Sequence, residues 1–169
     1  MRPLRWGVLG TAHINRLLIP AIRATGRSAV HAVASRSAER AAAYAAEWDI
    51  PRGFAAYDAL LHSADVDIVY VPLPNSLHVP WSIRALEAGK HVLCEKPLAL
   101  APSDVDRVAD AASRSGRVAT EGFMYRHHAM TLRVQELLAN GTIGGLRSID
   151  GLFTYSRSRE RDVRLDPEL

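Results

Sequence analysis

The sequence predicts an α/β protein with a doubly wound parallel sheet, followed by the beginning of a second, α+β domain. Short apolar segments alternate with helix-forming segments from residue 6 to residue 121, the order expected of a parallel sheet with helices on both faces. Residues 65–71 are a near-continuous apolar run after acidic turn residues, as in a strand covered on both faces. We therefore expect one domain over residues 1–121 and a crossover into the second domain over residues 122–169.

The composition excludes several classes of protein. The 169 residues are 48% hydrophobic, which suits one globular domain plus part of a second. The net charge of +3 comes from scattered arginines without interleaved aromatics, so we expect no nucleic-acid partner. No window approaches the roughly 18 apolar residues of a membrane span. A single cysteine, Cys94, excludes an internal disulfide, and we expect a cytoplasmic protein in which Cys94 is a buried strand residue.

Residues 5–10 predict a buried first strand that ends in a glycine, followed by a turn and a helix over residues 17–24. This order is typical of a dinucleotide-binding fingerprint, in which turn amides and the helix N-terminus hold the phosphates. Ala12 and Asn15 stand where the full pattern has glycines, and Asn15 is the larger departure. Pro20 lacks a helical donor, so we expect a kink or a late helix start. The candidate phosphate-binding residues are Gly10, Thr11, Ala12, His13 and Ile14.

The second strand, over residues 29–34, is followed by Ser35 and Arg36, where a residue contacts the adenosine ribose of a bound dinucleotide. An acidic residue there would accept hydrogen bonds from a free 2′-hydroxyl, whereas serine and arginine offer donors and positive charge. The pair therefore predicts NADP, with NAD less favoured. Arg40, one turn further along the helix over 37–48, shares a face with Arg36. The alternative is that both arginines are solvated residues of a helix start.

The later strands bring further groups to the same edge of the sheet. A short third strand follows residues 50–54, and the fourth strand ends at Pro72 and Pro74, which cannot donate to a ladder. A helix over residues 79–88, ended by Gly89, follows. The next strand, 92–94, delivers Glu95, Lys96 and Pro97 to its carboxyl end, where open α/β sheets bind ligands.

After Pro97 the sequence predicts a helix capped by Ser103 and running to about residue 113, then a strand within residues 116–121. A helix over residues 131–140 is ended by Gly141, and residues 146–155 alternate as a strand. The charged residues from 156 onward show no apolar face. Because an unpaired strand tends to associate, we expect self-pairing or disorder after about Leu146.

Residues 86–97, Leu-Glu-Ala-Gly-Lys-His-Val-Leu-Cys-Glu-Lys-Pro, closely resemble the signature of the glucose-fructose oxidoreductase, inositol dehydrogenase and rhizopine-catabolism (Gfo/Idh/MocA) family. Residues 6–15 resemble a variant of its nucleotide turn, and residues 122–128 resemble its crossover out of a Rossmann-like domain. The resemblance extends to about residue 166. Family members continue into a mostly antiparallel sheet that forms the substrate pocket, and we expect that portion to be missing here.

The resemblance implies roles for particular residues. Lys96 would face the nicotinamide and the substrate hydroxyl, where its ammonium can hydrogen-bond the reacting oxygen and share proton transfer. Glu95 would orient that amine, and the Lys96–Pro97 peptide would be cis. Arg126 and His127 would approach the active site, although a structural ion pair is equally plausible for Arg126. No metal site is expected. The residues that would line the nicotinamide side are Leu73, Pro74, Asn75 and His78.

The implied function is an NADP-dependent oxidoreductase that transfers hydride between nicotinamide and the carbinol carbon of a sugar, polyol or cyclic diol. The expected partner is a small carbohydrate-like substrate, without nucleic acid or membrane. Full-length relatives are expected to form homo-oligomers through the C-terminal sheet. The alternative is a non-catalytic dinucleotide-binding module, or a fragment that lacks the substrate domain. We expect this chain alone to be inactive or weakly active.

Overall fold

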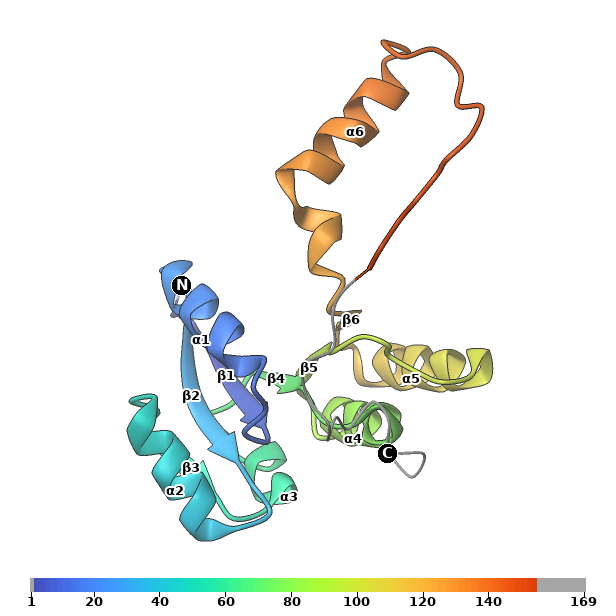
Figure 1. Ribbon diagram of the computed structural model, residues 1–169. Coiled ribbons are helices and arrows are strands. Elements are labelled where there is room, and N and C mark those ends of the chain that lie inside the picture. The colour runs from blue at the N-terminus through green and yellow to red at the C-terminus, as the bar shows by residue number, and fades with distance from the viewer. Residues whose placement is uncertain (1, 155–169) are drawn as a thin grey trace. The chain divides into compact units, whose positions relative to one another are not determined.

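The computed structural model describes residues 2–154 and divides into two units, residues 1–122 and 123–169. The first unit contains one six-stranded sheet of order β3-β2-β1-β4-β5-β6, with every neighbouring pair parallel (Figure 1). The predicted doubly wound parallel sheet is therefore confirmed. The strands are β1 (Leu4–Leu9), β2 (Ser28–Ala34), β3 (Arg52–Phe54), β4 (Ile68–Val71), β5 (His91–Cys94) and β6 (Ala119–Glu121).

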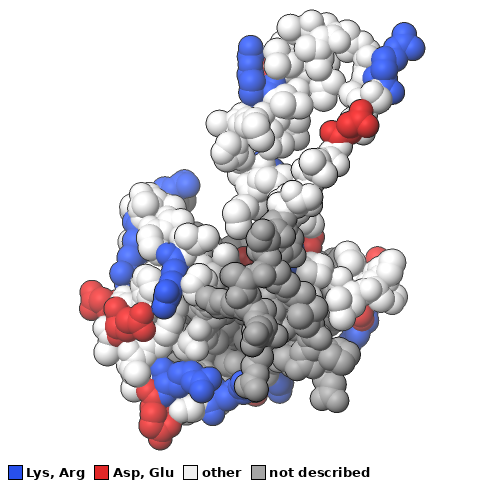
Figure 2. Space-filling view, in the orientation of Figure 1, with Lys and Arg blue, Asp and Glu red and all other residues white. Residues whose placement is uncertain are grey.

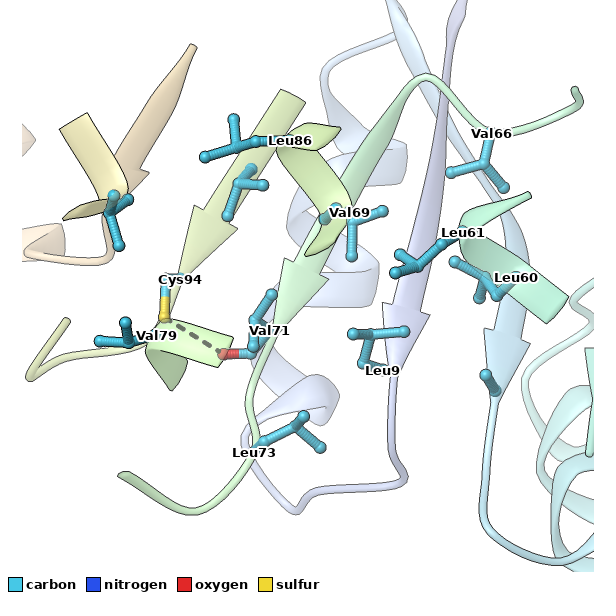
Figure 3. Packing of buried hydrophobic residues seen from close by; sticks show 14 of the residues in the cluster. Leu9, Leu60, Leu61, Val66, Val69, Val71, Leu73, Val79, Leu86 and Cys94 are labelled. Atoms are coloured by element: carbon cyan, nitrogen blue, oxygen red, sulfur yellow. Dashed lines mark hydrogen bonds between the residues drawn. The ribbon is translucent and has the colours of Figure 1, made fainter. Parts of the chain in front are cut away.

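Five helices cover the two faces of this sheet, which explains why its strands are apolar without alternation. Val8 packs in a cluster with residues of α1 and α2, while its neighbour Leu9 packs in a second cluster with residues of α3, α4 and α5. Figure 3 shows the second cluster, in which Leu9, Val69 and Val71 meet the helix residues. The helices are α1 (Asn15–Ala24), α2 (Ala38–Glu47), α3 (Tyr57–Leu61), α4 (Asn75–Glu87) and α5 (Pro102–Ser115).

Several helix boundaries differ from the prediction. α1 begins at Asn15 and continues past Pro20, so the expected late start is wrong. α4 begins four residues earlier than expected, directly after Pro74. Ser103 does not cap α5, because Pro102 occupies the first helical position, where its missing N–H costs nothing and its fixed φ suits a helix. The short helix α3 was not predicted.

Over its described residues, 123–154, the second unit contains a 3₁₀ turn, η1 (Met124–His127), and one helix, α6 (Ala129–Ala139). α6 starts two residues earlier than predicted because the His128 side chain accepts the N–H of Met130 and caps it. The predicted strand at 146–155 is wrong over residues 146–154, which form no strand. Without a second strand among the described residues of this unit, its backbone has no ladder to join. Residue 155 and the charged stretch from 156 lie outside the described residues.

An ion-pair network at the amino edge of the sheet fixes the start of β4. Asp67 accepts two hydrogen bonds from the Arg2 guanidinium, at 2.7 and 2.9 Å, and one from the Arg5 backbone N–H at 2.9 Å. The Asp67 N–H in turn donates to the Arg5 carbonyl oxygen at 2.8 Å. The hydrogen bonds from Arg2 and Arg5 hold the pKa of Asp67 well below its usual range, against the opposing effect of burial.

Replacing Asp67 with alanine is expected to lower the free energy of unfolding by about 2 kcal/mol, because the Arg5 side chain and amide lose their partner. Thermal unfolding followed by circular dichroism measures this loss. Asp65→Ala is the control, since Asp65 pairs with Arg5 at 2.8 Å but is 45% exposed. For such an exposed pair we expect a change below about 1 kcal/mol.

The effect of Asp67 should depend on pH. A carboxyl group whose pKa is lowered by folding stabilises the protein above its unfolded pKa of about 3.9 and loses that contribution as pH falls toward the folded value. The difference in stability between wild type and Asp67→Ala should therefore be complete at neutral pH and shrink below about pH 4. An equal difference at neutral and strongly acidic pH would contradict this account.

Candidate functional site

The turn between β1 and α1 has the geometry of an anion-binding loop. Gly10 has a φ of +87°, in the left-handed region, and its N–H donates to the Ala34 carbonyl oxygen at 2.7 Å, which joins the ends of β1 and β2. A Cβ atom at Gly10 would lie 3.2 Å from Leu73 Cδ2, so the turn packs closely on the loop after β4. The four N–H groups of residues 11–14 donate to no acceptor among the described residues. They are thus available to a phosphate at the start of α1.

Asn15, the larger departure from the glycine pattern, closes this turn. Its side chain is fully buried, and Nδ2 donates to the Gly10 carbonyl oxygen at 3.1 Å. Its backbone N–H donates to the Ala12 carbonyl oxygen at 3.1 Å. Where a glycine would allow helix and strand to approach, Asn15 instead fastens the first residue of α1 to the first residue of the turn. The sequence pattern alone does not reveal this role.

Two arginines and a tyrosine lie at the tip of β2. Arg36 and Arg40 are both exposed, and Arg40 follows the N-cap Ser37 of α2. Burial raises the pKa of the Tyr57 hydroxyl, while the charges of Arg36 and Arg40 act in the opposite direction. Ser35 is buried, and its N–H donates to the Phe54 carbonyl oxygen at 3.0 Å.

Tyr57 was not predicted from the sequence, because it follows a short strand and lies in an unpredicted helix. Its hydroxyl oxygen is 3.7 Å from the position that a Cβ atom at Gly10 would take, so it lies beside the phosphate turn. Trp81 of α4 meets the Tyr57 ring edge to face, with 4.9 Å between centroids. The ring contact holds Tyr57 beside the turn.

The loops after β4 and β5 meet at His78. Leu73 is buried, whereas Pro74 and Asn75 are half-buried at the start of α4. His78 is 1% exposed, and its ring nitrogens lie 2.6 Å from the Pro97 carbonyl oxygen and 2.7 Å from the Leu73 carbonyl oxygen. Its predicted packing against a cofactor stays a prediction.

Glu95 is held by residues other than the lysine amine. Its Oε1 accepts a hydrogen bond from the Tyr70 hydroxyl at 2.7 Å, and its Oε2 accepts the Lys96 backbone N–H at 3.3 Å. Burial and the contact with Glu95 raise the pKa of Tyr70 strongly. Among the described residues Glu95 makes no ion pair with the Lys96 amine, so it fixes the lysine through its backbone.

Lys96 presents an exposed amine at the carboxyl edge, and its peptide bond to Pro97 is cis, as the resemblance implied. The chain has one other lysine, Lys90, which is buried at the amino edge. The Nζ atom of Lys90 donates to the carbonyl oxygens of Ser63 and Val66 at 2.7 and 2.9 Å. Lys96 is therefore the lysine available for chemistry at the edge where the phosphate turn lies.

The end of β6 closes over the same loop. The Gly122 N–H donates to the Cys94 carbonyl oxygen at 2.7 Å, and Glu121 accepts the Leu98 N–H at 2.8 Å. Burial raises the pKa of the Cys94 thiol to about 12, which disfavours a thiolate nucleophile. Arg126 and His127 are exposed in η1 of the second unit, so their approach to the active site stays a prediction.

Figure 2 shows both acidic and basic side chains on the part of the first unit that it leaves in view. Among residues 2–154 no group of histidine, cysteine, aspartate and glutamate side chains is arranged to hold a metal ion. Within the same residues no helix is both long and apolar enough to cross a membrane.

The sequence model of the oxidoreductase family with an NAD-binding Rossmann fold (GFO_IDH_MocA) matches residues 4–123. The chain belongs to the Gfo/Idh/MocA family. It is 44% identical over 170 residues to the dTDP-3,4-didehydro-2,6-dideoxy-α-D-glucose 3-reductase of Streptomyces violaceoruber, covering 100% of this chain and 49% of that enzyme. It is 40% identical over 168 residues to D-xylose 1-dehydrogenase (NADP⁺) 2 of Haloferax volcanii, covering 98% of this chain and 51% of that protein.

Solved structures of the Gfo/Idh/MocA family share this fold. The crystal structure of a 3-ketoreductase from Actinomadura kijaniata in complex with TDP-benzene and NADP has a TM-score of 0.78 and is 42% identical. The match covers 85% of this chain and 45% of that protein. The chain thus contains the NAD(P)-binding domain of a family of sugar oxidoreductases, and it spans about half the length of these relatives.

Proposed function

We propose that this chain is the cofactor half of an NADP-dependent oxidoreductase that transfers hydride between nicotinamide and the carbinol carbon of a sugar, polyol or cyclic diol. The observation that carries the proposal is one sheet edge with free turn amides, an arginine pair and an accessible lysine. The named relatives reduce a keto sugar nucleotide or oxidise xylose. Because they are about twice as long, we propose that most substrate contacts come from residues beyond this chain.

The turn residues Gly10, Thr11, Ala12, His13 and Ile14 would hold the pyrophosphate. The free amides of residues 11–14 and the N-terminal end of α1 provide hydrogen-bond donors and a positive dipole. Asn15 keeps the turn closed, so the donors are already arranged before a ligand arrives. Because the turn amides need not be ordered on binding, the ligand loses less free energy to the conformational entropy of the loop.

Arg36 and Arg40 would bind the adenosine 2′-phosphate, with Tyr57 and Ser35 beside them. Charge-assisted hydrogen bonds from guanidinium to phosphate are about twice as strong as neutral ones. No carboxylate stands directly after β2 to prefer a free 2′-hydroxyl, so NADP is favoured over NAD. The xylose dehydrogenase is named for NADP, and the ketoreductase was crystallised with it.

Lys96 would act on the reacting oxygen of the substrate, while the bound cofactor supplies or accepts the hydride. Its ammonium donates a hydrogen bond to that oxygen and stabilises the alkoxide that develops during the reaction. The same amine can give or take the proton that accompanies hydride transfer. Leu73, Pro74 and Asn75 would line the nicotinamide side, and Arg126 of the crossover would approach from the second domain.

The test of cofactor choice is a fluorescence titration of the chain with NADPH and with NADH. We expect NADPH to bind at least about tenfold more tightly, because its additional phosphate meets two guanidinium groups. A panel of aldoses, polyols and keto sugar nucleotides then tests turnover. Equal affinities would contradict the NADP assignment. Tight NADPH binding in a full-length protein that turns over no sugar would favour a non-catalytic module.

A further inference from the structure

His78 reaches from α4 to two loops at the carboxyl edge of the sheet. Its Nδ1 lies 2.6 Å from the carbonyl oxygen of Pro97, and its Nε2 lies 2.7 Å from the carbonyl oxygen of Leu73. Both partners are acceptors, so a neutral ring donates one of these bonds and a doubly protonated ring donates both. A ring that donates one bond ties α4 to one of the two loops, and a ring that donates both connects the segment after β4 with the segment after β5.

Further contacts hold the chain on both sides of Lys96. On one side the Tyr70 hydroxyl of β4 anchors the Glu95 carboxylate at 2.7 Å. On the other, Glu121 at the end of β6 anchors the Leu98 N–H at 2.8 Å. Side chains from β4, β6 and α4 therefore hold the segment around Lys96 at three points. The Lys96 amine itself donates to no acceptor among the described residues.

We propose that His78 is a positioning residue, which acts through the Pro97 carbonyl to hold Lys96 where it meets the nicotinamide and the substrate. The ring is 1% exposed and both its nitrogens face backbone oxygens, so it has no polar atom left for a cofactor. This inference rests on the function proposed above for Lys96. It replaces direct cofactor packing by His78 with an indirect role.

The first test compares NADPH with adenosine 2′,5′-bisphosphate, which carries the phosphorylated adenosine but no nicotinamide. His78→Phe keeps a flat ring and removes both ring nitrogens. We expect it to weaken NADPH binding about tenfold and to leave bisphosphate binding within about twofold. In a Lys96→Met background the effect of His78→Phe on NADPH should largely disappear, because the two residues act together. Equal losses for both ligands, or additive effects, would overturn the proposal.

The control is His91→Phe, which removes an imidazole bond at the opposite end of β5. There the Val118 N–H donates to His91 Nδ1 at 3.1 Å. This variant should leave the affinities for both ligands unchanged. His78→Gln retains one amide donor and should fall between wild type and His78→Phe, which keeps the test decisive should the phenylalanine variant fold poorly.

Amide hydrogen exchange in the ligand-free chain separates this proposal from the proposed function. His78→Phe should speed exchange at the amides of Lys96 and Leu98, while the amides of β1 keep their protection. Unchanged exchange at those two amides would overturn the positioning role even when NADPH binds normally. Faster exchange in a chain that binds neither nucleotide would support the His78 anchor and reject the NADP-dependent function.

Discussion

Lys96→Met is expected to lower the turnover of a sugar substrate by about 10³-fold, within the range that a general acid–base group contributes. Methionine has a similar length but neither charge nor proton, so the developing alkoxide loses its hydrogen-bond donor. The affinity for NADPH should fall by about tenfold at most, because Lys96 would meet only the nicotinamide and the phosphates are bound elsewhere. Steady-state kinetics of the full-length protein, with cofactor binding measured alongside, provide the check.

Lys96→Arg separates charge from proton transfer. Arginine keeps a positive donor but is not deprotonated in proteins, so it can stabilise an alkoxide and cannot exchange a proton. If both roles belong to Lys96, Lys96→Arg should recover only part of the turnover lost in Lys96→Met. Wild-type turnover in Lys96→Met would remove the residue from the chemistry. A loss of NADPH affinity as large as the loss of turnover would assign it to binding instead.

The parallel sheet was predictable because its signals are local. Apolar runs that end in glycine or proline mark β1 and β4, and the intervening helices force parallel connections. The position of Lys96 followed from the same logic, since residues after parallel strands meet at one edge. In the structure Gly10, at the end of β1, lies beside Ala34, which directly precedes Ser35.

The residues that support this edge were not predictable from the sequence, because each acts across a long separation in the chain. Tyr70 lies inside an apolar strand, and nothing in that run indicates that its hydroxyl meets Glu95. Tyr57 of α3 and Trp81 of α4 are 24 positions apart in the sequence, and their rings come into contact only in the folded chain. The failed strand at 146–154 shows the converse: alternation predicts a strand only where another strand can pair with it.

Reversing both charges at the tip of β2, with Arg36→Glu and Arg40→Glu together, is expected to weaken NADPH binding by about 10²-fold or more. Two guanidinium donors are lost, and two carboxylates then repel the 2′-phosphate. NADH carries a hydroxyl at that position, so its affinity should change by only about threefold. Arg36→Ala alone should cost NADPH about tenfold. Fluorescence titrations at one fixed salt concentration measure each of these affinities, since screening alters all of them.

The matched control reverses two arginines of α5, Arg107→Glu and Arg114→Glu, which changes the net charge equally on another helix. Long-range attraction alone would make this control as damaging as the change at β2. Direct contact with the 2′-phosphate predicts instead that the ratio of NADPH to NADH affinity collapses in the Arg36 and Arg40 variant and persists in the control. A ratio that stays constant in both would show that these arginines are solvated helix-start residues, and cofactor choice would then rest on other groups near Tyr57.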